Sequence, residues 1–236
     1  MKLAKVVASL VIGLIGMTIA SCGSTGSDKA ASSTTSVSPR LDRATAKAVN
    51  LSATDLPGWK QTPNTSTSSD QAMASRLATC AGAKDPSVVD VVDVNSPNFD
   101  QGQTEVSSDV TMVKTHADGI ADLEALQSSK LDACVQQIAV PELKKELPVG
   151  ATLSNLQINP IHPTGLPQDS FALRLDATVA IPQAGSVSIS SDEIGFLSGR
   201  AEIELQASQV QGGVPSQVLE QRLLALLVTR AQRNVA

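Results

Sequence analysis

Aromatic and basic side chains are scarce in this chain of 236 residues. There is no tyrosine, and Trp59, Phe99, Phe171 and Phe196 are the only aromatic residues. Sugar-binding grooves and methylammonium cages stack their ligands on aromatic faces, so neither kind of site is expected. Acidic residues outnumber basic ones by 23 to 18, which gives a formal net charge of −5. Nucleic acid is therefore not an expected partner, because phosphate binding needs clustered Lys and Arg.

Motifs of common enzymes are missing as well. The chain has no Gly-x-Ser-x-Gly, Ser-x-x-Lys or His-Glu-x-x-His sequence and no glycine-rich phosphate loop. A triad with a distant base remains conceivable, because triads depend on geometry and not on sequence order. His116 adjoins a predicted helix start and His162 lies between Pro160 and Pro163, so both are expected to be exposed loop residues. We predict no enzymatic activity, no cofactor and no metal site.

The start of the chain has the pattern of a bacterial lipoprotein signal peptide. Lys2 and Lys5 precede an apolar run over residues 6–19, and the sequence Ile-Ala-Ser-Cys follows at 19–22. The run is shorter than the roughly 20 residues of a membrane span, and small residues precede Cys22 as a signal peptidase requires. We therefore predict cleavage before Cys22 and acylation of its sulfur. The alternative is an ordinary secretory signal peptide cleaved near Ala20.

The rest of the chain divides into a tether and one domain. Residues 22–45 are rich in Ser, Thr and Ala without apolar periodicity, which is typical of a flexible tether. Residues 46–236 are long enough for one packed domain. The predicted location is the outer side of the cell membrane, with the acyl chains as the membrane contact.

Hydrophobic periodicity predicts helices followed by a sheet. A helical period predicts helices over 70–82, 117–139 and 215–233, the second ending at Pro141. Alternation predicts strands over 104–114, 153–158, 171–181, 187–196 and 201–208, with a bulge near Ser191 and Asp192 and a turn at Ser198 and Gly199. Residues 88–94 fit either a strand or a helix. The expected fold class is α+β, with an antiparallel β-sheet packed by helices.

Two cysteines remain after acylation of Cys22. Cys80 and Cys134 both lie on apolar faces of predicted helices. In an oxidising compartment they have only each other as partners, so we predict a disulfide between them. Two buried thiols are the alternative.

Two groups of acids deserve a structural interpretation. Asp85, Asp90 and Asp93 could suggest a calcium site, but they lack the loop that surrounds one ion with oxygens, and a solvated edge is the preferred interpretation. The row Glu202, Glu204 and Gln206 on the last predicted strand is interpreted first as an exposed face and second as a partner surface.

Several of these features together suggest a family. They are the Ile-Ala-Ser-Cys sequence at 19–22 (the lipobox), the Ser/Thr-rich tether, the Leu-Ser-Ala-Thr-Asp-Leu-Pro-Gly-Trp segment at 51–59, the cysteine pair on two helices, and the Phe-Leu-Ser-Gly-Arg-Ala hairpin at 196–201. In these the chain resembles the LpqN-type lipoproteins of mycobacteria, which have a PsbP-like α/β fold. More distantly it resembles the extracellular sensor domain of a mycobacterial serine/threonine kinase.

The resemblance implies a binding or interaction role at the cell envelope. The expected function is that of a membrane-anchored, non-enzymatic lipoprotein whose sensor-like domain binds an envelope protein or a small hydrophobic ligand. A lipid or glycolipid carrier is the alternative, and it requires a large apolar cavity. The apolar residues of the predicted helices favour a packed core over such a cavity.

Overall fold

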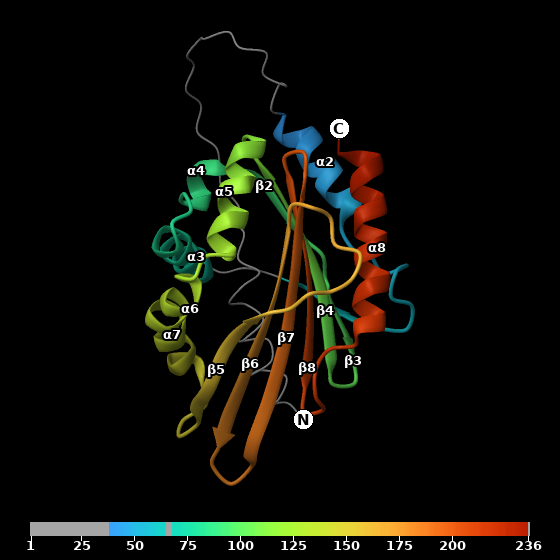
Figure 1. Cartoon of the computed structure of the whole chain (residues 1–236). Helices are drawn as coiled ribbons and strands as arrows, with labels where there is room; N and C mark the ends of the chain where they lie inside the picture. Colours follow the sequence, from blue (N-terminus) through green and yellow to red (C-terminus); the bar gives the residue numbers. More distant parts are fainter. Residues whose placement is uncertain (1–37, 65–67, 236) are drawn as a thin grey trace.

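An eight-stranded antiparallel sheet forms the centre of the molecule (Figure 1). The computed structural model describes residues 38–64 and 68–235. Seven strands lie in the order β1-β3-β4-β8-β7-β6-β5, and β2 pairs with β4 beside this path. The strands are β1 (Lys60–Thr62), β2 (Asp90–Asn95), β3 (Asn98–Gln101), β4 (Thr104–Val113), β5 (Thr152–Pro160), β6 (Ser170–Ile181), β7 (Gly185–Ser198) and β8 (Ala201–Val210).

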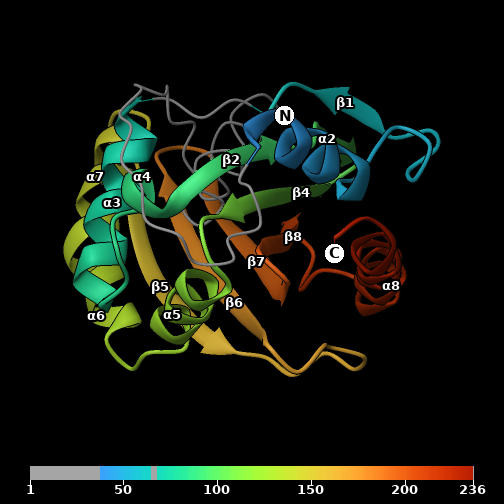
Figure 2. The same cartoon turned by 90° about the horizontal axis from the view of Figure 1, so that it is seen from above.

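Helices cover both faces of this sheet. Seen from above, α3, α6 and α7 lie on one side of the curved sheet, and α2 and α8 lie on the other (Figure 2). The helical segments are α2 (Pro39–Val49), α3 (Ser68–Ala81), α4 (Pro86–Val89), α5 (His116–Leu126), α6 (Leu131–Cys134), the π-helical η1 (Val135–Ala139), α7 (Val140–Glu146) and α8 (Gln217–Asn234). The α+β fold with an antiparallel sheet and helices in one domain is confirmed. In the described part of the chain, no helix is both long enough and apolar enough to cross a membrane.

The face that carries α2 and α8 contains the larger apolar core. Leu223, Leu224 and Leu227 of α8 are at most 2% exposed and pack on the sheet. Their partners on the sheet include Ile203 and Leu205 of β8, which are fully buried. This packing explains the final amphipathic helix, whose apolar stripe needs a sheet face to cover.

Ion pairs tie this helical layer to the rest of the chain. Arg230 of α8 donates to both carboxylate oxygens of Asp55, at 2.7 and 2.9 Å. Arg200, in the turn between β7 and β8, pairs with Asp42 of α2 at 2.8 Å. Asp42 lies in a segment predicted to be tether, so ordered structure begins earlier than expected, with the helix α2.

The opposite face contains a second core under α6, η1 and α7. Val135 and Ile138 of η1 and Leu143 of α7 pack against Leu175 and Ile189 of the sheet. The prediction of one helix over 117–139 is wrong in its details. The first helix, α5, ends at Leu126. A second helical run begins at Leu131 and continues past Pro141, which lies in the first turn of α7. Proline lacks an amide hydrogen, and it is tolerated here because the π-helical turn η1, which changes the hydrogen-bond spacing, ends two residues before it.

Two smaller expectations also need comment. The bulge predicted near Ser191 and Asp192 is absent, since β7 pairs without a register shift with both of its neighbours. Residues 88–94, which fitted helix or strand, divide between the end of α4 and β2. Asp85 is the N-cap of α4, and its Oδ1 accepts a hydrogen bond from the Ser87 amide at 3.0 Å.

Candidate functional site

The acidic row on β8 is covered, and the prediction of an exposed face is wrong. Glu202 and Glu204 are half-buried, and Gln206 is only 7% exposed. The predicted alternation of apolar and polar residues along β8 is confirmed, because Ile203 and Leu205 face α8. The polar positions face α3 and α5 instead of solvent, because both faces of this sheet carry helices.

The predicted solvated edge on β2 is also wrong for two of its three acids. Asp85 is half-buried at the start of α4, but Asp90 and Asp93 are only 6% and 8% exposed. Asp93 pairs with Thr111 of β4, and Thr111 pairs with Glu202 of β8. Directly paired residues point to the same face, so the acids of β2 and β8 share one surface. Within the described residues, no group of Asp, Glu, His or Cys has an arrangement that could hold a metal ion.

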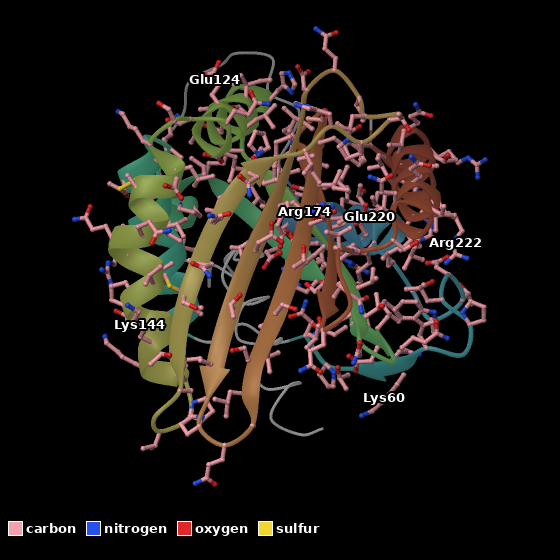
Figure 3. The ribbon with its side chains drawn as sticks, turned by 60° about the horizontal axis from the view of Figure 1, so that its bottom comes forward. Lys60, Glu124, Lys144, Arg174, Glu220 and Arg222 are labelled. Atoms are coloured by element: carbon pink, nitrogen blue, oxygen red, sulfur yellow. A yellow bond between two sulfur atoms is a disulfide. The ribbon has the colours of Figure 1, made fainter. Side chains whose placement is uncertain are left out.

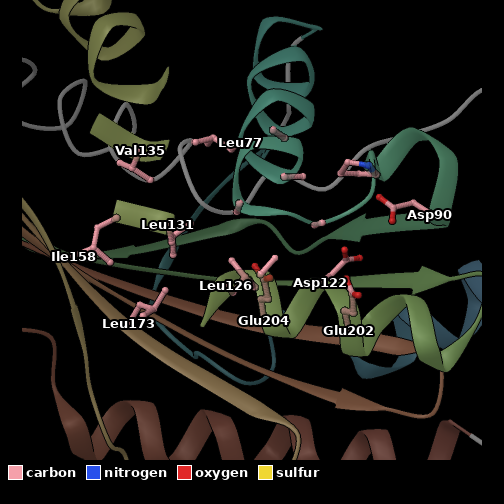
Figure 4. Close-up of a pocket in the computed structure, with 16 residues that line it drawn as sticks. Leu77, Asp90, Asp122, Leu126, Leu131, Val135, Ile158, Leu173, Glu202 and Glu204 are labelled. Carbon is pink, nitrogen blue, oxygen red and sulfur yellow. The ribbon is translucent and has the colours of Figure 1, made fainter. Parts of the chain in front are cut away.

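A cleft of about 140 Å³ lies where these acids meet the helices (Figure 4). Its residues come from the helical segments α3, α4, α5, α6 and η1, the loop after α3, and the strands β2, β5, β6 and β8. Most are apolar, and the four polar ones are all carboxylic acids. The lining residues are Ala74, Leu77, Ala78, Ala81, Ala83, Pro86, Asp90, Asp122, Ala125, Leu126, Leu131, Val135, Ile158, Leu173, Glu202 and Glu204.

The two kinds of side chain lie at different ends of the cleft. Figure 4 shows Asp90, Asp122 and Glu202 together at one end, with Glu204 beside Leu126 toward the middle. The other end contains only aliphatic side chains among those labelled, namely Leu77, Leu131, Val135, Ile158 and Leu173. The cleft therefore has an acidic pole and an apolar pole.

Burial in this cleft keeps protons on its acids. Burial raises the pKa of Glu204 to about 7, and the nearby Asp93 acts in the same direction. Burial also raises the pKa of Asp122 to about 6, with smaller opposing contributions from Glu202 and Lys84 and a raising one from Asp118. A buried carboxyl resists ionisation because its charged form loses hydration.

Glu202 and Asp122 act as a pair. Burial, followed by the charges of Asp122, Asp90 and Glu204, raises the pKa of Glu202 well above its usual range. A hydrogen bond joins the carboxyls of Glu202 and Asp122, and it raises the pKa of Glu202 while lowering that of Asp122. Glu202 is therefore the group that keeps the proton, as expected when two carboxyls share one site.

One further acid extends the row deeper into the sheet. Glu193 of β7 is 1% exposed, and its Oε1 accepts a hydrogen bond from Nε2 of Gln206 at 2.5 Å. Burial, with the charge of Glu204 next, raises its pKa well above the usual range. Glu193 does not line the cleft, but its position opposite Gln206 places it on the same face of the sheet.

The helical wall of the cleft is held by the disulfide. Cys80 of α3 and Cys134 of α6 are bonded, with their Cα atoms 5.8 Å apart, as predicted. The bond fixes α3, which carries Leu77 and Ala81, against the segment that carries Leu131 and Val135. Disulfides are typical of oxidising compartments, so this bond suggests a location outside the cytoplasm.

A glycine lets α5 approach the sheet closely. A Cβ atom on Gly119 would lie 2.6 Å from Cδ1 of Leu197 and 3.2 Å from Oε1 of Glu202. Any side chain at this position would require Leu197 to move or α5 to shift away from β7 and β8. Gly119 thus brings Asp122, one turn later on α5, within reach of Glu202.

The remaining predicted residues do not gather at the cleft. His116 and His162 are both exposed, and Nδ1 of His116 lies 2.7 Å from the Gly199 carbonyl oxygen. Cys22 lies outside the described residues. The sequence does not predict Asp122 and Leu131 as site residues. Asp122 follows Asp118 by one helical turn, and such a pair of acids is a weak signal of a shared surface.

Comparisons with known proteins identify no family. No protein-family model matches the chain, and no curated protein has a matching sequence. Among solved structures, the chain is similar to the extracellular domain of PknH from Mycobacterium tuberculosis, with 10% sequence identity and a TM-score of 0.38. The match covers 84% of this chain and 97% of that domain. A similarity this weak carries no argument about fold, ligands or chemistry.

Proposed function

We propose that this protein is a membrane-anchored envelope lipoprotein whose domain binds a ligand in the cleft between α3, α5 and the sheet. It acts by binding and not by catalysis. The observation that supports this most directly is an apolar cleft with a few converging, perturbed carboxyls, which is the usual character of a small-molecule site.

The membrane anchor in this proposal is the acylated Cys22. The support is the sequence of residues 1–22 together with a disulfide that suits an oxidising compartment. Such an anchor, through the chain between Cys22 and α2, would keep the cleft close to the membrane surface.

The alternative role as a lipid or glycolipid carrier is less well supported. Pockets for drug-sized ligands span about 300–1,000 Å³, whereas this cleft has a volume of about 140 Å³. A volume of this size suits one short apolar group more than a whole acyl chain. The apolar pole still favours a ligand with some hydrophobic surface.

Native mass spectrometry of the protein extracted from its own membrane tests the proposed function. We expect a small molecule to accompany the wild-type protein and to be lost from Ala78→Leu, because Ala78 lines the cleft and a larger side chain would fill it. The same preparations, labelled with an alkyne fatty acid, should carry the label in the wild type and not in Cys22→Ala. A ligand retained by Ala78→Leu would place binding elsewhere and contradict the proposal.

A further inference from the structure

Building on the proposed function, we propose that the cleft takes a small organic cation, a primary ammonium attached to an apolar group about the size of a benzene ring. The ammonium would lie against Asp122, Glu202 and Glu204. The apolar group would lie against Leu131, Val135 and their neighbours at the other end of the cleft.

The charge of the lining selects a cation. Four of the residues that line the cleft are acids. Among the lining residues that the structure describes, there is no Lys, Arg or His. Lys84, whose charge acts on Asp122, is already paired with Asp118 at 2.7 Å. An anionic ligand would be repelled by carboxyls that are partly ionised at neutral pH, without a base in the lining to compensate.

The hydrogen-bonding state of Glu202 also indicates a missing donor. Its Oε1 atom is shielded from solvent and accepts no hydrogen bond from the described residues. Buried polar atoms normally have a partner, so an orphaned carboxyl oxygen at a cleft calls for an explanation. An ammonium supplies three N–H donors at one point, which is what neighbouring carboxyls can accept.

The volume sets the size of the apolar part. A dry cavity of about 150 Å³ lined by aliphatic and aromatic side chains is known to hold benzene. The cleft has nearly this volume, and its aliphatic end lies apart from its acids (Figure 4). Since the chain is poor in aromatic residues, recognition here relies on carboxyls and not on cation–π stacking.

Binding of a cation should release protons. The ammonium restores the charged form of carboxyls that burial keeps protonated, so affinity should rise as the pH increases from about 5 to 8. The titratable groups that act on the acids of this site are Asp90 and Asp93 of β2, Lys84 after α3, Asp118 and Asp122 of α5, Glu193 of β7, and Glu202 and Glu204 of β8.

The test uses three probes of one shape on the purified full chain: benzylamine, benzyl alcohol and phenylacetate. Titrations are followed by amide chemical shifts, with a detergent-only blank. We expect benzylamine to bind at least tenfold more tightly than benzyl alcohol and phenylacetate to bind most weakly. Glu204→Gln should weaken benzylamine about tenfold, whereas Glu124→Gln, which alters an exposed acid on α5 (Figure 3), should leave it unchanged.

Each other outcome overturns a distinct part of the account. Benzyl alcohol binding in the cleft as tightly as benzylamine would overturn the cation preference while leaving the cleft as a ligand site. Benzylamine binding unchanged by Ala78→Leu would place the cation elsewhere and overturn both proposals. The comparison of probes on the wild-type protein stands even if a variant fails to fold.

Discussion

Removal of the Cys80–Cys134 disulfide should cost the domain much of its stability. The bond closes a loop with a sequence separation of 54 residues. On the chain-entropy relation for crosslinks, a loop of this length contributes about 4 kcal/mol by restricting the unfolded chain. Since small domains are stable by only about 5–15 kcal/mol, the Cys80→Ala/Cys134→Ala variant should be marginal.

The position of the bond adds a local effect. Among the helices, α3 packs mainly on α6 and η1 and makes fewer contacts with α4 and α5. Without the disulfide, α3 should open before the sheet does, and the cleft would lose one wall. The core under α2 and α8 should respond less, because it is built from other residues.

Urea unfolding measures both effects. Far-UV circular dichroism reports on the helices, and fluorescence of Trp59, which packs against the α2 and α8 core, reports on the other face. We expect a loss of about 4 kcal/mol and a helical signal that begins to change before that of Trp59. Reductant should destabilise the wild type and leave the double variant unchanged. A loss below about 1 kcal/mol would refute the reasoning.

Three further substitutions test other contacts. Arg230→Met should lower the free energy of unfolding in urea by about 2 kcal/mol, because Asp55 loses its cation. The side chain of Asp55 is only 8% exposed, so water compensates for this loss only in part. Burial raises the pKa of Glu220 to about 8, so the native state holds its proton more tightly than the unfolded state. Stability should therefore fall as the pH rises from about 4.5 to 8, and Glu220→Gln should reduce that fall, measured by urea midpoints across this range. Gly119→Val should destabilise the domain by about 1–3 kcal/mol in thermal unfolding, because its side chain would overlap Leu197.

The Glu220 prediction depends on a compact charged group between α8 and the sheet. Figure 3 shows Glu220 of α8 next to Arg174 of β6. Arg174 binds Asp192 of β7 through two hydrogen bonds of 2.5 and 2.6 Å, and Asp192 is fully buried. After burial, the charge of Asp192 is the largest cause that keeps the proton on Glu220, while Arg174 acts in the opposite direction. Glu220→Gln should thus be nearly neutral for stability below about pH 4, where Glu220 carries its proton in both states, and stabilising at pH 6, where only the native state keeps it.

Local patterns predicted most of the fold. The alternation in β6 and β8 and the apolar stripe of α8 identify elements that the structure places close to their expected bounds. The prediction of one long helix is wrong because its apolar stripe, which includes Leu131 and Val135, lies wholly after the break that follows Leu126. Periodicity measures which face is buried and does not reveal such an interruption.

The candidate site could not be predicted because it depends on tertiary cover. Alternation in β8 separates Glu202 from Ile203, but it does not say which face meets solvent. The presence of helices on both sides turns an apparent wet face into a buried acidic one. Asp122 joins this face only because Gly119 allows α5 to lie close to the sheet, and no local pattern encodes that approach.

The central claim is that the apolar residues around the acids of the cleft raise the pKa values of these acids above their usual range. Carboxyl ¹³C chemical shifts of Asp122, Glu202 and Glu204, followed from pH 3 to 9, test it directly. The account predicts midpoints of about 6 for Asp122 and about 7 for Glu204, with Glu202 titrating well above its usual range. Midpoints near 4 for all three carboxyls, as in solvent-exposed acids, would contradict it.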